Sequence, residues 1–137
     1  FSAMADILIS MGDPGKAEPL VRKAMRLDPK DKYAYTFILG KAQLVKGQLQ
    51  EAITSLESVT QRQPDNRLAW MVLICGYGLN GHSDQAGVAL KILNELQRRD
   101  KIVSFTVANA REHWPFKNES DRYFFLDGLR KAGVPEW

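Results

Sequence analysis

Apolar residues recur at steps of three and four positions along most of the chain, a spacing that predicts amphipathic helices. The clearest pair covers residues 32–46 and 49–62. Gly47 separates the two segments and is expected to take the left-handed conformation that ends a helix. Pro64 stops the second segment because proline disfavours helical geometry in the residue before it. The pattern therefore predicts a helix–turn–helix hairpin.

Signals of this hairpin recur along the sequence. Glycines follow apolar helical patterns at intervals of 35 and 34 residues, and each is followed five residues later by alanine: Gly12 with Ala17, Gly47 with Ala52, and Gly81 with Ala86. Pro29 and Pro64 keep the same step. One hairpin cannot bury its own apolar faces, whereas stacked neighbours can. The sequence thus predicts an all-α stack of about three hairpins over residues 1–98, the first of them truncated at its N-terminus.

These marks resemble the tetratricopeptide repeat (TPR) family. The second unit carries the family's Leu-Gly pair, loop glycine, Glu-Ala pair and final proline, and the third adds its Trp and Tyr: Leu39-Gly40, Gly47, Glu51-Ala52, Pro64, Trp70 and Tyr77. The chain departs from the family pattern at Thr36, Ile74 and Arg98, where Trp, Gly and Pro are usual. The resemblance implies a right-handed superhelical stack with a concave groove that binds proteins or peptides.

Residues 76–81 read GYGLNG, which also matches a dinucleotide-binding loop between the apolar run 69–75 and a helical segment. A nucleotide-binding enzyme is the alternative that this motif raises. A Rossmann unit needs further parallel strands, however, and only residues 102–108 alternate like a strand. The repeat makes Gly81 a loop glycine, with Ser83 or Asp84 expected to cap the next helix. Gly76 and Gly78 would then lie inside a helix that a neighbour approaches closely.

The periodicity ends near residue 99, and residues 99–137 are predicted to form a C-terminal helical cap. A short helix is expected over 104–115, capped by Ser104 and ended by Pro115. A second helix is expected over 118–133, between an Asn118 cap and Gly133. Its apolar stripe must be buried somewhere: Tyr123, Phe124, Leu126 and Leu129. The stripe can cover the exposed side of the third hairpin, or it can occupy the groove of the array or of a partner.

The ending WPFKNESDRYFFLDGLRKAGVPEW is similar to the C-terminus of TPR regions that follow the catalytic domain in some bacterial class III adenylate cyclase-like proteins. The cyclase catalytic domain has no counterpart in these residues. The resemblance implies that the chain is the non-catalytic regulatory or scaffolding part of a larger bacterial signalling protein, located in the cytoplasm.

Composition narrows the candidate chemistry. The 19 basic and 16 acidic residues are scattered, which argues against a nucleic-acid or membrane-binding face. No apolar run approaches the roughly 20 residues of a membrane span, and no signal peptide is recognised. A single cysteine, Cys75, fits a reducing compartment. His82 and His113 lack metal-ligand spacing, and no carboxylate pair suggests acid–base catalysis. We therefore expect no enzyme activity, cofactor or metal.

Binding of a partner is the remaining candidate function, and the TPR resemblance implies which side chains line the groove. Carried onto this chain, the groove positions are Ala34, Phe37, Lys41, Leu44, Leu68, Met71 and Cys75, with Gly78 and the N-terminal positions Ser2, Asp6 and Ile9 as extensions. Lys41 is the single cation among them, so the family's carboxylate clamp is absent. The largely apolar wall favours an amphipathic helix over an acidic peptide tail. Self-association as a homodimer is a further alternative, as is a groove filled by the chain's own C-terminal helix.

Overall fold

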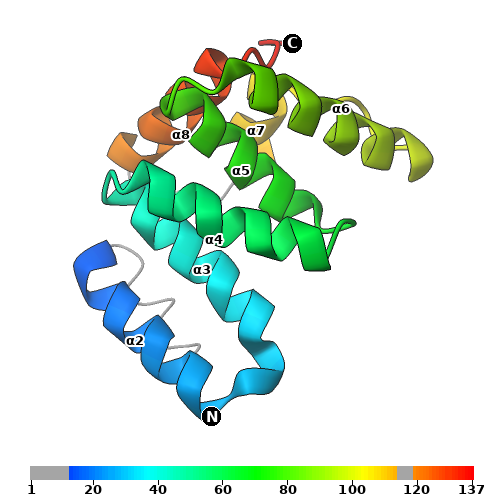
Figure 1. Ribbon diagram of the computed structural model, residues 1–137. Helices are drawn as coiled ribbons and strands as arrows, with labels where there is room; N and C mark the ends of the chain where they lie inside the picture. The colour runs from blue at the N-terminus through cyan, green and yellow to red at the C-terminus, as the bar shows by residue number, and fades with distance from the viewer. Residues whose placement is uncertain (1–12, 114–118) are drawn as a thin grey trace.

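The computed structural model describes residues 13–113 and 119–137, and all regular elements in these ranges are helical (Figure 1). They are α2 (Pro14–Leu27), the short 3-10 helix η1 (Pro29–Asp31), α3 (Lys32–Val45), α4 (Leu49–Arg62), α5 (Arg67–Leu79), α6 (Ser83–Arg99), α7 (Val107–His113) and α8 (Glu119–Lys131). The predicted all-α class is confirmed. Ser2, Asp6, Ile9, Gly12, Pro115 and Asn118 lie outside the described residues.

Successive helices from α2 to α6 pack against one another in chain order, so that α3 with α4 and α5 with α6 form stacked hairpins (Figure 1). The main apolar core is formed by α3, α4, α5 and α6 together with C-terminal side chains such as Phe125 and Leu129. Helix α2 packs on α3 through a separate apolar cluster. Gly40 allows the α3–α4 approach that the sequence predicts, because a Cβ there would lie 2.8 Å from Cγ of Leu56. The predicted bounds of this hairpin, 32–46 and 49–62, agree with the helices to within one residue.

Three helices end at a glycine in the left-handed conformation, with φ angles of 81°, 74° and 89° at Gly47, Gly81 and Gly133. The N–H of the following residue returns to a carbonyl of the last turn in each case, as in a Schellman motif. Helix α6 ends in the same way on Lys101, whose φ is 59°, and the Ile102 N–H donates to the Gln97 carbonyl over 2.7 Å. Lys101 thus replaces the glycine, and α6 stops without the family's usual proline.

Two predicted helix caps are wrong, and in each case the helix starts at a slightly different residue from the one predicted. Ser83 is the first residue of α6, with His82 in the cap position and no side-chain cap bond, so neither Ser83 nor Asp84 caps it. The start of α7 is capped by Thr106, whose Oγ1 accepts the Asn109 N–H over 3.1 Å, and not by Ser104. The C-terminal tail fixes this later start, because the Val107 N–H donates to the Pro135 carbonyl over 2.9 Å.

Helix α8 packs against α5 and α7, and α6 makes no comparable contact with it (Figure 1). The α5 and α8 backbones touch directly: a Cβ on Gly78 would lie 2.1 Å from the Gly128 carbonyl oxygen. On α8, Phe125, Leu126 and Leu129 are buried, whereas Tyr123 is 70% exposed. Phe125 therefore takes the buried place predicted for Tyr123, and Phe124 is half-buried. Helix α8 therefore lies on the groove side of the array, against α5, and the prediction that it covers the exposed side of α6 is wrong.

The outer side of α6 differs from that of α4 at the positions that receive the next repeat. In α4, Glu57 accepts a hydrogen bond from the Tyr77 hydroxyl over 2.5 Å, and Ile53 lies beside Gly76 of α5. The equivalent positions of α6, one repeat later, are Gly87 and Lys91. A Cβ on Gly87 would meet nothing within 4 Å, and Lys91 is exposed. Helix α6 thus lacks, at these two positions, the side chains with which α4 contacts the following helix.

The two helical glycines predict opposite responses to alanine. Gly78→Ala should destabilise the fold by about 1–3 kcal/mol, because the added methyl group would meet the α8 backbone. Gly87→Ala adds a methyl group in open space and should stabilise the fold by up to about 1 kcal/mol through helix propensity. Urea unfolding monitored by circular dichroism measures both changes. An unchanged midpoint for Gly78→Ala would contradict the α5–α8 contact.

Candidate functional site

Helix α8 divides the groove predicted from the sequence into a closed half and an open half. In the closed half, Cys75 is fully buried, and its S–H donates to the Phe125 carbonyl of α8 over 3.5 Å. Leu44 is also fully buried, since it packs into the core beside Gly76 of α5. Neither side chain can contact a partner, so the assignment of Leu44 and Cys75 to an accessible groove wall is wrong. The close packing of α8 on the C-terminal part of α5 covers Cys75, whereas Leu44 is covered by the core between α3, α4 and α5.

The open half contains the remaining apolar positions. On α3, Ala34 is exposed and Phe37 is half-buried; on α5, Leu68 is 52% exposed and Met71 is half-buried. Ala34 with Leu68, and Phe37 with Met71, occupy equivalent positions of two neighbouring helices that touch. Beside α5 lies a hollow of about 240 Å³, lined by Leu68, Met71, Gln97, Ile102, Val103, Phe105 and Asn109. We call this hollow, together with Ala34 and Phe37, the open groove.

The far wall of the open groove is the chain that follows α6. The Gln97 side-chain amide donates to the Val103 carbonyl over 3.3 Å, and Asn94 Oδ1 accepts the Phe105 N–H over 2.9 Å. These two bonds hold an extended segment in which Phe105 is buried while Ile102 and Val103 remain exposed, by 39% and 70%. Sequence reasoning missed both exposed residues as groove residues. Residues 102–108 alternate between apolar and other side chains, but this alternation is typical of a strand and does not indicate a groove wall.

Lys41 lies at the position of α3 that is equivalent to Cys75 of α5 and one turn beyond Phe37. It is half-buried, and its ammonium group lies 5.6 Å from the centroid of the Phe37 ring. Among the described residues, no carboxylate forms an ion pair with it. Burial lowers the pKa of Lys41, because removing water disfavours the charged amine. A carboxylate beside Lys41 would stabilise its charged ammonium group, as water does for an exposed lysine.

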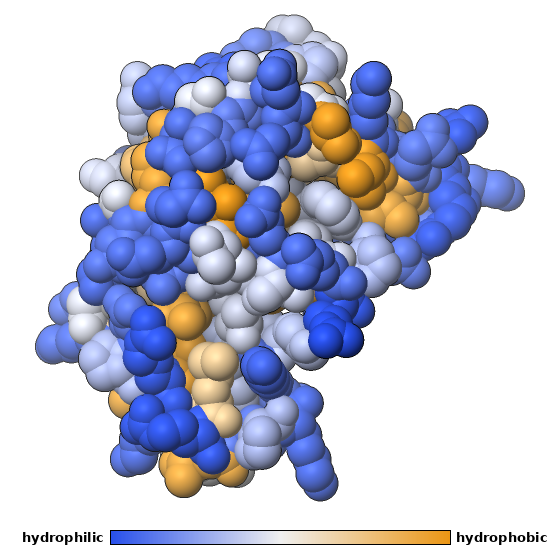
Figure 2. Space-filling view, viewed as in Figure 1, coloured by the Kyte–Doolittle hydropathy of each residue, from blue (hydrophilic) through white to orange (hydrophobic). Residues whose placement is uncertain are grey.

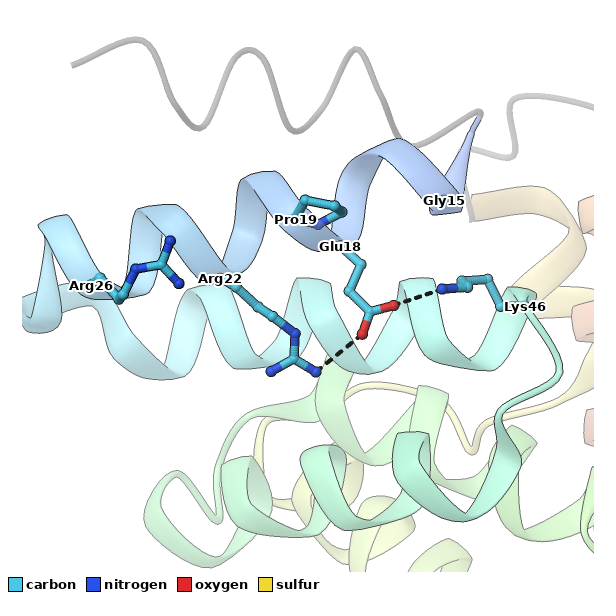
Figure 3. Close-up of a pocket in the computed structure, with 6 residues that line it drawn as sticks. All are labelled: Gly15, Glu18, Pro19, Arg22, Arg26 and Lys46. Carbon is cyan, nitrogen blue, oxygen red and sulfur yellow. Dashed lines mark hydrogen bonds and ion pairs between the residues drawn. The ribbon is translucent and has the colours of Figure 1, made fainter.

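A second hollow, of about 390 Å³, lies between α2 and the α3–α4 turn (Figure 3). Glu18 occupies its centre and pairs with Lys46 over 2.8 Å and with Arg22 over 3.0 Å. The hydrogen bond from Lys46, with a smaller one from Arg22, holds the pKa of the Glu18 carboxyl below its usual value. Gly15, Pro19 and Arg26 complete the lining. Because the carboxylate already engages Lys46 and Arg22, this cluster ties the first hairpin to the second.

The catalytic alternative does not fit the local structure. The run 69–75, which the dinucleotide motif requires as a strand, lies inside helix α5. Gly76 and Gly78 are helical as well, and Gly81 forms the turn. Burial also raises the pKa of the Cys75 thiol, which keeps it from acting as a thiolate. Within residues 13–113 and 119–137, no three His, Cys, Asp or Glu side chains are grouped as a metal site.

Two further side chains complete the sequence-based candidates. His82 lies in the α5–α6 turn, with its ring centroid 6.3 Å from that of Tyr77. The side chain of His113 lies outside the described residues. None of the described helices combines the length and hydropathy that crossing a lipid bilayer requires.

Comparison with known proteins agrees with this architecture. A family model described as tetratricopeptide repeat matches residues 8–73. A TPR repeat-containing protein of Methanocaldococcus jannaschii is 37% identical over 66 residues, which are 48% of this chain and 19% of that protein. The chain thus spans about a fifth of the length of this curated relative. The fold is an all-α stack of helical hairpins, and over residues 8–73 its sequence is similar to tetratricopeptide repeats.

The Glu18 cluster predicts an acid-sensitive contribution to stability. Its folded-state pKa is depressed, so the contribution is present above the ordinary glutamate pKa of about 4.3 and is lost as pH falls through the folded-state value. Glu18→Gln should therefore lower the free energy of unfolding at pH 7 by about 1 kcal/mol or less. It should also flatten the stability profile below about pH 5.

Chemical denaturation at several pH values between neutral and strongly acidic tests this expectation. Glu95→Gln is a matched control, because Glu95 also pairs with an arginine but is 68% exposed. If both variants changed the profile equally, the Glu18 ion pairs would have no special stabilising role.

Proposed function

We propose that this chain is a protein–protein interaction module that binds a short amphipathic helix in the open groove. The observation that carries the proposal is the apolar hollow beside α5, whose walls leave Leu68 and Val103 more than half exposed. Apolar side chains that face one another across a hollow gain free energy when a ligand removes them from water. TPR domains in general bind proteins or peptides, which supports the same class of ligand.

The chain's own C-terminal helix supports the choice of a helical ligand. Helix α8 lies on the other half of α5 and buries Phe125, Leu126 and Leu129 there. The surface of α5 is therefore suited to an amphipathic helix whose apolar residues recur at three- and four-residue steps. Half-buried Met71 adds an adaptable side chain at the centre of the open half.

Lys41 adds a polar requirement to this apolar ligand. Its half-buried ammonium group has no carboxylate partner among the described residues, and a ligand carboxylate would supply one. Pairing a partly desolvated charge contributes more than pairing an exposed one. The preferred ligand is accordingly an amphipathic helix with one Asp or Glu near the end that approaches α8, and not a multiply acidic tail.

We further propose that the chain belongs to the non-catalytic part of a larger bacterial, cytoplasmic, adenylate cyclase-like signalling protein. The similarity of residues 114–137 to the ends of such proteins supports this context. The sequence of the complete parent polypeptide tests it directly. An upstream domain of another class would remove the cyclase context and leave the groove proposal intact.

Charges placed in the open groove should abolish ligand binding without unfolding the protein. The variant Leu68→Glu with Val103→Glu puts two carboxylates on exposed positions of the hollow, so the melting temperature should change little. Helical peptides selected by display against the native chain should lose at least about 2 kcal/mol of binding free energy, measured by calorimetry. Leu27→Glu is the matched control, because Leu27 is 60% exposed on α2, away from the hollow. Equal binding by the double variant and the control would overturn the groove proposal.

The role of Lys41 is tested by a double-mutant cycle. Lys41→Met keeps the apolar stem and removes the charge. It should weaken binding of an acid-bearing selected peptide by about tenfold and leave the corresponding amide peptide unaffected. Equal losses for the two peptides would show that Lys41 contributes packing and not charge.

A further inference from the structure

The outward face of α6 carries apolar side chains where the preceding repeat is polar. Val88 is 61% exposed and Ile92 is 37% exposed. One repeat earlier, the equivalent residues on α4 are Thr54 and Ser58. Figure 2 shows hydrophobic side chains gathered along α6, on the face where α4 and α6 lie in front. This apolar stripe contributes nothing to the repeat stack or to the open groove.

The charges beside the stripe differ between the two ends of α6. Asp84 lies in the first turn, whereas Arg98 and Arg99 lie in the last turn. Asp84 and Arg98 flank the same edge of the Val88–Ile92 stripe, because helical residues spaced by multiples of three and four share a side. If a copy of the same helix runs in the opposite direction, Asp84 of each copy lies near Arg98 of the other. A parallel copy would bring like charges together.

We propose that a second copy of this chain docks here, with the two α6 helices packed antiparallel about a two-fold axis. Val88 then contacts Ile92 of the second copy, and Ile92 contacts its Val88. Asp84 faces Arg98 of the second copy at each end. Such a self-complementary patch satisfies the requirement of a two-fold interface that the same surface serves both subunits. The antiparallel arrangement also places the helix dipoles favourably.

The charge pattern favours this occupant over an unrelated partner, because Asp84 and Arg98 of α6 supply both halves of a complementary pair. Lys91 lies on the same edge near the axis, but it is exposed and its ammonium group stays in water. Arg98 pairs within its helix with Glu95, but both side chains are largely exposed, at 77% and 68%. Exchanging this surface pair for one across the axis therefore costs little. Ala89 and Leu96 lie beside the stripe on its inner edge and are buried in the chain's own core, so this edge of the interface is apolar.

The interface is small, with two exposed apolar side chains from each copy. Its dissociation constant is accordingly expected on the order of tens of micromolar or weaker. Sedimentation equilibrium of the full chain over a wide concentration range should show a reversible monomer–dimer transition. A monomer at every concentration up to the millimolar range would overturn the proposal.

Substitution by the residues of the preceding repeat tests the stripe without disturbing the fold. The variant Val88→Thr with Ile92→Ser should weaken dimerisation by about tenfold or more, with a native-like circular dichroism spectrum. Leu27→Thr and Leu68→Thr remove exposed apolar side chains elsewhere and should leave the dissociation constant unchanged. A dimer that persists in the double variant would lie on another surface and would also overturn the proposal.

A charge exchange tests the antiparallel arrangement. Asp84→Arg alone and Arg98→Asp alone should each weaken the dimer, because each creates two like-charge contacts across the axis. The combined variant restores both pairs in the reversed sense and should dimerise like the native chain. Failure of this restoration would exclude the antiparallel α6 interface. The groove variants of Leu68 and Val103 act on a different surface, so either proposal can fail while the other holds.

Discussion

The contact between the α5 and α8 backbones at Gly78 and Gly128 determines what the rest of the molecule can present to a partner. A side chain at either position would collide with the opposite helix, so both positions must lack a Cβ for the helices to touch. This approach seals Cys75 beneath α8 and leaves Leu68 and Met71 uncovered further along the same helix. The extent of the candidate binding surface therefore depends on two glycines that themselves contact no ligand.

The hairpins could be predicted from the sequence because local features specify them. Apolar spacing, the loop glycines and the prolines at the repeat boundaries act within a few residues, and α4 begins and ends where its pattern predicts. The helical positions of Gly76 and Gly78 followed from the repeat and not from the dinucleotide motif. Thr106 could not be distinguished from Ser104 as a cap, since the hydrogen bond that sets the start of α7 runs from the Val107 N–H to the carbonyl of Pro135, more than twenty positions away.

The candidate site was less predictable because it depends on contacts distant in sequence. An amphipathic stripe on residues 118–133 shows that one face must be buried, but it does not identify the surface that buries it. The groove positions carried over from the TPR resemblance include Leu44 and Cys75, because that resemblance takes no account of the C-terminal helix. Ile102 and Val103 follow the last repeat, where no family position applies. Their exposure results from the side chains of Asn94 and Gln97, which bind the neighbouring backbone.

Gly87 and Lys91 give this repeat protein a definite size in one direction. A solenoid built from equivalent units has no intrinsic length, and each unit offers its successor the same seat. Ile53 and Glu57 contact the following helix in one repeat. In the next repeat their places are taken by Gly87, which has no side chain, and by the exposed Lys91. Helix α6 consequently does not offer a following helix the contacts that α4 makes with α5. For the proposed groove, this favours a ligand of a few helical turns and therefore a linear motif over a folded domain.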